Sequence, residues 1–220
     1  DAYHLADIAH LSGLIAADQF PSPVGIADFA TSSSYKTIRA GRGGFILCDE
    51  EYAEAVDAAS FPGLQGGAAM PNIAGKAAGF AEAREPEFEA HIEQVCANAE
   101  ALADSLADHG YRVVSGGTDT HIVVLDVRPE ADLTGPRAEA LLEEAGIIAT
   151  TVGVPGTDEA ADTGGIRLGT QALTSRGFDG DELRTVGELI ARCLDDREVT
   201  PAVETEVDRL CRANPLYEGT

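Results

Sequence analysis

Short strand-like and helical segments alternate over the first sixty residues, and this alternation restricts the fold class. Strand-like patterns cover residues 2–9, 26–31 and 44–48, and helical patterns cover about 10–17 and 49–59. Alternation of this kind predicts an α/β layer, whose ligands bind beyond the C-terminal ends of the strands. Polar residues that follow these strands are therefore the first candidates for a functional site.

The rest of the chain predicts a change of architecture. The Gly- and Pro-rich stretch 61–72 predicts a loop, and residues 73–82 are helical in composition. Apolar residues then recur at steps of three and four from Phe88 to Leu106, which predicts a long amphipathic helix. Beyond it we expect strands at 111–114, 121–127, 147–150 and 166–168, helices at 136–145, 181–193 and 201–212, and a loop at 153–165. This divides the chain into an α/β part (1–85), a connecting helix (86–110) and an α+β domain (111–220).

The charge balance excludes some partners. The 220 residues include 38 acidic and 15 basic side chains, a formal net charge of -23, so binding to nucleic acid or to an anionic membrane is not expected. Lys36 and Lys76 are the two lysines, and the other basic residues are arginines. An acid-rich, lysine-poor surface is typical of a halophile-like protein that works in high salt, and an ordinary acidic protein is the alternative.

The cysteines and the chain ends complete the general interpretation. Four cysteines without a CxxC pair predict reduced thiols and no metal site. No apolar run approaches the roughly 20 residues that span a bilayer, so a cytoplasmic protein is expected. The sequence enters a strand-like segment at once and lacks an initiator methionine, and we therefore expect a fragment of a longer chain.

Asp7 and Lys36 suggest a specific chemistry. They lie 29 positions apart, about one strand–helix–strand unit, so they can end neighbouring strands at one edge of a sheet. A lysine amine forms a Schiff base with the aldehyde of pyridoxal 5'-phosphate (PLP), and a carboxylate beside the pyridine nitrogen keeps that nitrogen protonated. The alternatives are a helix N-cap for Asp7 and a solvated loop lysine for Lys36.

Three further features are candidates on their own residues. Arg167 lies in a strand-like segment, where its guanidinium can hold a substrate carboxylate or form a structural ion pair. His121 faces a similar choice, and a satisfied core histidine is favoured. Gly66 and Gly67 can bring backbone N–H groups close to a phosphate, although a simple turn is the default interpretation.

Several segments in a fixed order resemble serine hydroxymethyltransferase, a PLP enzyme of fold type I. The family patterns are V-D-x-A-H, T-T-T-x-H-K-T with R-G-G, F-P-G-x-Q-G-G-P, S-G-G-T-D-x-H and S-G-I-R-x-G-T-x-A-x-T-x-R-G-F. They match ADIAH (6–10), SSSYKT (32–37) with RGG (42–44), FPGLQGGA (61–68), SGGTDTH (115–121) and GGIRLGTQALTSRGF (164–178). The resemblance covers nearly the whole chain but begins inside the family's large domain, so it implies part of that domain followed by the C-terminal α+β small domain.

The resemblance implies a role for each matched residue. Lys36 would be the Schiff-base lysine, Asp7 the partner of the pyridinium nitrogen, and His10 a neighbour of the cofactor's phenolic oxygen. Arg167 would hold the amino-acid carboxylate. Ser33 would also contact the cofactor, and Gly66 and Gly67 would reach the cofactor phosphate of a partner subunit. A homodimer or higher oligomer, or a complementary N-terminal half, is therefore expected.

The implied reaction interconverts serine and glycine, with transfer of the one-carbon unit to tetrahydrofolate. The chain departs from the family pattern at Tyr35, where the family has histidine at a position that the resemblance links to substrate and reaction specificity, and at Ala68 and Pro71. It departs again at 150–155, where Val152 replaces an asparagine on the folate side, and at 158–163, where the family's S-P-F is absent. Two alternatives follow: a folate-independent aldolase or transaldolase that accepts threonine, or a non-catalytic paralogue.

Overall fold

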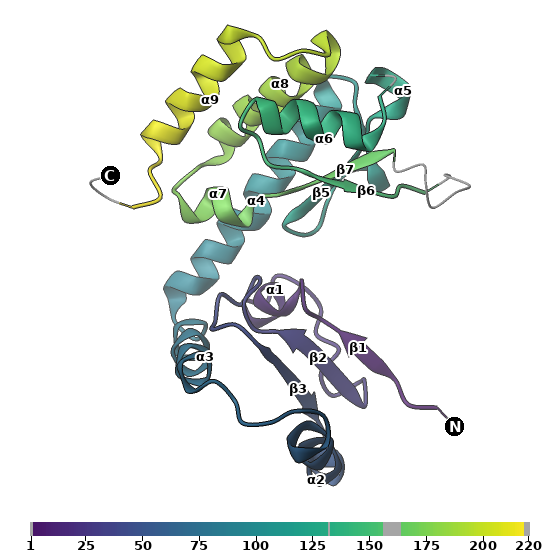
Figure 1. Cartoon of the computed structure of the whole chain (residues 1–220), viewed down its shortest axis with the longest axis vertical. Helices are drawn as coiled ribbons and strands as arrows, with labels where there is room; N and C mark the ends of the chain where they lie inside the picture. The colour runs from purple at the N-terminus through teal and green to yellow at the C-terminus, as the bar shows by residue number, and fades with distance from the viewer. Residues whose placement is uncertain (1, 132, 156–163, 218–220) are drawn as a thin grey trace. The chain divides into compact units, whose positions relative to one another are not determined.

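The computed structural model describes residues 2–131, 133–155 and 164–217, and the chain forms two compact units, Asp1–Glu93 and Gln94–Thr220. The first unit contains a three-stranded sheet of β1 (Leu5–Asp7), β2 (Phe29–Ser33) and β3 (Gly44–Cys48) in that spatial order. β1 and β2 are parallel, and β3 is antiparallel to β2 (Figure 1). The predicted bounds of β3 are confirmed.

Helices connect the strands of this unit. They are α1 (Ser12–Ala16), between β1 and β2, then α2 (Glu50–Ala58), a π-helical turn η1 (Ala59–Leu64) and α3 (Met70–Glu82). Several large apolar side chains remain exposed on the unit, among them Leu5, Ile26, Ile46, Leu47 and Leu64.

Three predictions of secondary structure in the first unit were wrong at their boundaries. The first strand was predicted at 2–9, whereas β1 covers only Leu5–Asp7. β2 begins at Phe29 and not at Ile26, because the N–H groups of Ile26 and Ala27 both donate to the carbonyl of Pro23 and close a turn there. The predicted 61–72 loop ends earlier than expected, because α3 begins at Met70; within η1, Phe61 has an extended backbone with φ -138° and ψ 125°. Pro71 is compatible with α3 because a proline in the first helical turn removes no intrahelical hydrogen bond.

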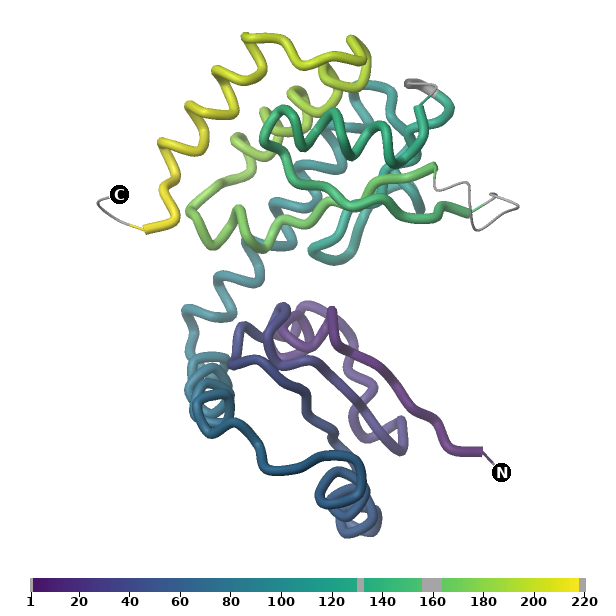
Figure 2. Tube along the Cα trace, viewed as in Figure 1, coloured from purple at the N-terminus to yellow at the C-terminus, as the bar shows by residue number. Residues whose placement is uncertain are grey.

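The predicted long helix is α4 (Pro86–Asp108), and the boundary between the two compact units lies within it. The second unit has a four-stranded antiparallel sheet, in the order β4 (Arg112–Val113), β5 (Ile122–Asp126), β7 (Gly165–Gly169) and β6 (Thr150–Val152). β5 and β7 are far apart in sequence and lie side by side along the trace (Figure 2).

Helices of the second unit pack on this sheet and on each other. They are the 3₁₀ turn η2 (Val114–Gly116), α5 (Arg128–Ala131), α6 (Gly135–Glu144), α7 (Gln171–Ser175), α8 (Gly180–Asp196) and α9 (Pro201–Ala213). α6 contacts β6, β7 and α8, and α8 contacts α9 (Figure 1). The short helices α5 and α7 were not predicted. Across the described part of the chain, every helix is too short or too polar to cross a membrane.

Local signals fix the ends of these helices. Asp179 and Glu182 form a reciprocal capping box at the start of α8, and the Thr200 hydroxyl accepts from the N–H of Val203 at the start of α9. The strand predicted at 147–150 was wrong, because a Schellman motif ends α6 there. Gly146 has φ +79° and the N–H of Ile147 donates to the carbonyl of Leu142, so the strand begins only at Thr150.

A buried carboxylate lies at the end of β5, in the same unit as a large apolar core. Leu125, Ile166, Leu183, Ile190 and Leu194 are among its fully buried side chains. Asp126 at the end of β5 is also fully buried, and it accepts hydrogen bonds from Arg128 Nε at 2.9 Å and Nη2 at 2.8 Å, and from Arg112 Nη1 at 3.3 Å. These bonds from Arg128, together with the Arg112 charge, hold the pKa of Asp126 below its usual value against the opposing effect of burial.

Candidate active site

The C-terminal ends of β1 and β2 meet at one edge of the first sheet. The strands are parallel neighbours, with Asp7 opposite Thr31, and Lys36 follows β2 by three residues. The Asp7 carboxylate is exposed and accepts from the N–H of Ala9 at 3.0 Å. It is not the N-cap of α1, since that position is Leu11. The expected placement of Asp7 and Lys36 at one sheet edge is therefore confirmed.

Lys36 lies against His10. Its Nζ is 3.2 Å from Nε2 of His10, and both side chains are partly buried. A protonated amine can only donate, so Nε2 accepts whenever Lys36 is charged. The Ser33 hydroxyl donates to the carbonyl of Ala9 at 3.4 Å. Asp7, His10, Ser33 and Lys36 therefore gather around the two connections that follow β1 and β2.

Thr37 fixes the backbone beneath this cluster. Its buried hydroxyl accepts from the N–H of Gly13 at 2.9 Å and donates to the carbonyl of His10 at 3.0 Å. Gly13 allows the approach, because a Cβ atom there would lie 2.4 Å from the backbone of Thr37. The start of α1 and the lysine-bearing loop are thus tied directly to each other.

The loop that carries Lys36 is closed by hydrogen bonds at its base. The N–H of Ser34 donates to the carbonyl of Gly43 at 2.9 Å, and its hydroxyl donates to the carbonyl of Gly41 at 2.6 Å. α3 packs on this loop where Gly79 meets Ala40; a Cβ on Gly79 would lie 2.5 Å from Ala40 Cα. The second lysine, Lys76, donates to the carbonyl of Gly44 at 3.2 Å, so it supports the start of β3.

Tyr35 is exposed and stacks on a neighbour that sequence reasoning assigned no role. The guanidinium carbon of Arg42 lies 4.7 Å from the centroid of the Tyr35 ring. Arg42 belongs to the R-G-G motif, so the motif was the signal that could have pointed to it. No pattern along the chain, however, indicates that Arg42 folds back over the residue before Lys36.

The remaining candidates lie elsewhere. Gly66 and Gly67 are exposed between η1 and α3, and an added Cβ on either would meet nothing within 4 Å among the described residues. Arg167 is exposed on β7, opposite Val124 of β5 and Thr150 of β6. It forms no ion pair with a described residue, which argues against the structural ion pair considered for it. His121 is buried, and its carbonyl accepts from the N–H of Thr170 at 3.1 Å.

Of the two departures from the family pattern on the folate side, the structure describes the one at 150–155. Thr151 of β6 donates two hydrogen bonds to the carboxylate of Glu139, one from its hydroxyl and one, at 2.7 Å, from its backbone N–H. These bonds lower the pKa of the Glu139 carboxyl. Val152 is half-buried at the end of the same strand. The departure at 158–163 lies outside the described residues.

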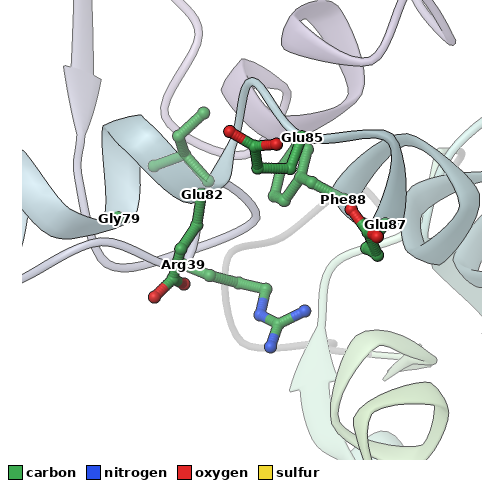
Figure 3. Close-up of a pocket in the computed structure, with 7 residues that line it drawn as sticks. Arg39, Gly79, Glu82, Glu85, Glu87 and Phe88 are labelled. Carbon is green, nitrogen blue, oxygen red and sulfur yellow. The ribbon is translucent and has the colours of Figure 1, made fainter.

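A cavity of about 270 Å³ in the first unit does not include Lys36. It is lined by Ile38, Arg39, Gly79, Glu82, Glu85, Glu87 and Phe88 (Figure 3). Arg39 has a left-handed backbone, with φ +58°. Burial, and to a smaller extent the positive charge of Arg39, lowers the pKa of His91. The cavity is rich in carboxylates and does not resemble a phosphate site.

Comparison with known proteins places these motifs in a family. The family profile of serine hydroxymethyltransferase matches residues 1–190. The chain belongs to the serine hydroxymethyltransferase family. Members of this family are PLP enzymes of fold type I, so the predicted fold class is confirmed.

Relatives named serine hydroxymethyltransferase match along nearly the whole chain. The relative from Natronomonas pharaonis is 54% identical over 100% of this chain and 53% of its own length. Those from Haloarcula marismortui and Haloquadratum walsbyi are 54% and 55% identical over 99% of this chain and 54% of their own lengths. The chain thus spans about half the length of the curated relatives it matches.

The residues at the sheet edge fit the cofactor that the family implies. A lysine amine, an exposed carboxylate and an imidazole are the groups that an aldehyde, a pyridine nitrogen and a phenolic oxygen require, and the first unit brings Lys36, Asp7 and His10 together. The phosphate has no evident holder among the described residues near Lys36. No described residue lies within 4 Å of a Cβ added to Gly66 or Gly67, which is compatible with contacts to another chain.

Proposed function

We propose that this chain is part of a PLP-dependent serine hydroxymethyltransferase that interconverts serine and glycine and passes the one-carbon unit to tetrahydrofolate. The observation that carries the proposal is the approach of Lys36 Nζ to His10 at the edge where Asp7 ends β1. The names of the relatives support the same reaction and favour neither the folate-independent alternative nor a non-catalytic role.

The residues of the first unit would divide the work. PLP, when bound, supplies an aldehyde for amine addition and a ring that accepts electrons. Lys36 would hold the aldehyde carbon through Nζ, and Asp7 would keep a proton on the pyridine nitrogen. His10 would accept a hydrogen bond from Lys36, and a proton can move between Nζ and Nε2 across 3.2 Å.

Arg167 would bind the substrate. Its guanidinium is exposed on β7, and a planar bidentate donor is suited to the carboxylate of an amino acid. Serine, glycine and longer β-hydroxy amino acids share that carboxylate, so Arg167 would select the class and not the individual substrate. Cytoplasmic location and assembly with a second subunit, or with the other half of the family's length, belong to the same proposal.

The test compares the two lysines in the full-length protein. Lys36→Ala should abolish both the visible absorption of lysine-bound PLP and serine cleavage. Lys76→Ala, which removes a bond to the Gly44 carbonyl, should leave the absorption band in place. Cleavage by the unaltered protein should accelerate saturably with tetrahydrofolate. An unchanged band in Lys36→Ala would refute the lysine assignment, and threonine cleavage without a folate response would favour the aldolase alternative.

A further inference from the structure

Arg167 lies on the face of the second sheet that is opposite to α6. Its neighbours on β7, Ile166 and Leu168, are buried in the core. Thr151 pairs with Ile166 and is bonded to Glu139 of α6, so these residues lie on the helix-covered face. Because successive side chains of a strand point to opposite faces, Arg167 belongs to the other face, and it is exposed there.

The same face carries a carboxylate. Asp126 is the one acidic residue in the described strands β4 to β7, and it pairs with Gly165, two positions before Arg167 on β7. Residues two apart on a strand share a face, and diagonal neighbours on adjacent strands lie about 7–8 Å apart, within reach of a long side chain. Gly165 has no side chain that would keep the two groups apart. The strand register therefore places a carboxylate within reach of the Arg167 guanidinium.

Two other arginines occupy this carboxylate completely. Arg128 donates to Asp126 through Nε at 2.9 Å, Nη2 at 2.8 Å and its backbone N–H at 3.2 Å, and Arg112 donates through Nη1 at 3.3 Å. A carboxylate has about four acceptor sites, two on each oxygen, and each oxygen of Asp126 accepts two of these bonds. Arg167 forms no ion pair with a described residue, which agrees with a neighbouring carboxylate that has no acceptor site left.

Without its donors, Asp126 would compete with a substrate for Arg167. A guanidinium uses the same N–H groups for a carboxylate of the protein and for a carboxylate of a ligand. A buried carboxylate that loses hydrogen bonds must find new donors, because an unsatisfied buried charge is more costly than a weak ion pair is favourable. Arg167 is the next guanidinium on this face, so it is the donor that Asp126 would reach.

We propose that Arg128, assisted by Arg112, is a positioning residue for substrate binding. By filling the acceptor sites of Asp126, it keeps the guanidinium of Arg167 available for the carboxylate of the amino acid. The proposal rests on the proposed function, in which Arg167 binds that carboxylate. It explains why an exposed arginine with a carboxylate at its diagonal position is not paired with it.

The first test measures KM and kcat for serine in the full-length holoenzyme. Arg128→Ala should raise KM about two- to fivefold, the strength of one partly exposed ion pair that the substrate must break, and should leave kcat unchanged. Adding Asp126→Asn should return KM to its original value, because an amide has no charge with which to hold Arg167. A rise in KM that persists in the double variant would overturn the proposal, since Arg128 would then act without Asp126.

Two further variants complete this test. Arg184→Ala is the matched control: it removes another exposed ion pair of the same unit, 3.8 Å from Asp104, and should leave KM unchanged. Arg112→Ala removes only the bond of 3.3 Å, so it should raise KM less than Arg128→Ala does, and Asp126→Asn should again reverse the rise. It replaces Arg128→Ala if that variant does not fold. An unchanged KM in both arginine variants would refute the proposal.

A second readout does not need the cofactor. The NMR resonance of the Arg167 Nε–H group, identified by its loss in Arg167→Ala, should shift in Arg128→Ala and return when Asp126→Asn is added. An unmoved resonance would mean that Asp126 does not reach Arg167, which overturns the proposal. A shifted resonance with an unchanged KM would refute Arg167 as the residue that binds the substrate, and with it the positioning role, while the contact between Asp126 and Arg167 would stand.

Discussion

Nζ of Lys36 lies 3.2 Å from Nε2 of His10, across the connection between two parallel strands. Thr37, the neighbour of Lys36, donates a hydrogen bond to the backbone carbonyl of His10. The two backbone segments that carry Lys36 and His10 are therefore joined directly beside this contact.

Substitutions of His10 should distinguish the roles of its two ring nitrogens. His10→Gln places an amide oxygen near the position of Nε2, whereas His10→Asn is too short to reach Lys36. We expect His10→Asn to slow PLP uptake by the apoprotein about tenfold, the size of a lost hydrogen bond to a charged group, and His10→Gln to slow it less. Stopped-flow absorbance on mixing with PLP measures both rates. Equal rates in the two variants would contradict a role for Nε2.

Arg167 should affect substrate binding more than the cofactor. Arg167→Ala is expected to raise the KM for serine about tenfold or more, because a charge-assisted pair with the carboxylate is lost, while the absorption spectrum of the holoenzyme stays the same. Arg184→Ala is the matched control, since Arg184 is an exposed arginine of the same unit that lies 3.8 Å from Asp104. If the spectrum of Arg167→Ala changes as much as its KM, Arg167 has a structural role.

Gly13 tests the contact between α1 and the lysine loop. Gly13→Ala would place a Cβ atom 2.4 Å from the Thr37 backbone, so either α1 or the loop must move. Overpacking of this kind costs about 1–3 kcal/mol, and we expect the free energy of unfolding to fall by that amount and PLP affinity to fall with it. Gly153→Ala is the control, because a Cβ there would meet no described residue within 4 Å. If the contact is unimportant, denaturant titration will show the same decrease in the free energy of unfolding for both variants.

Asp126 should make the second unit sensitive to acid. Its pKa is lowered in the folded state, chiefly by hydrogen bonds from Arg128, so its contribution to stability is present above the unfolded pKa of about 3.9 and is lost as pH falls through the folded pKa. Asp126→Asn should lower the free energy of unfolding by about 1–3 kcal/mol at neutral pH. The variant should also lose less of this free energy than the unaltered protein as the pH falls. Urea titrations at about pH 7, and in roughly half-unit steps from about pH 5 down to about pH 2, measure both effects. If the free energy of unfolding falls equally with pH in the variant and in the unaltered protein, Asp126 is not the cause of the acid sensitivity.

The acidic surface predicts a dependence on salt. With a formal charge of -23, the chain repels itself, and the Debye length falls from about 10 Å at 0.1 M salt to about 3 Å at 1 M. The melting temperature should therefore rise between these two KCl concentrations. A flat or falling melting temperature would favour an ordinary acidic protein over a halophile-like one.

The sequence by itself determined the local elements and the chemistry of the motifs. β3 was predicted with its observed bounds, and α4, α8 and α9 were predicted to within three residues at each end, because apolar periodicity and capping residues are local signals. The rarity of lysine and the motifs around Lys36 and Asp7 are properties of the residues alone, and they were enough to indicate the family. Element ends that depend on turns, as at Ile26 and Ile147, were wrong.

Only the tertiary structure decided which of these residues touch. The contact of Lys36 with His10, the bond from Thr37 to the His10 carbonyl and the stacking of Arg42 on Tyr35 all join groups whose distance depends on backbone packing or loop closure. A pattern along the chain specifies which face a side chain occupies, but not which side chain it meets. That meeting is set by the pairing of β1 with β2 and by the hydrogen bonds that close the loop from Ser34 to Gly43.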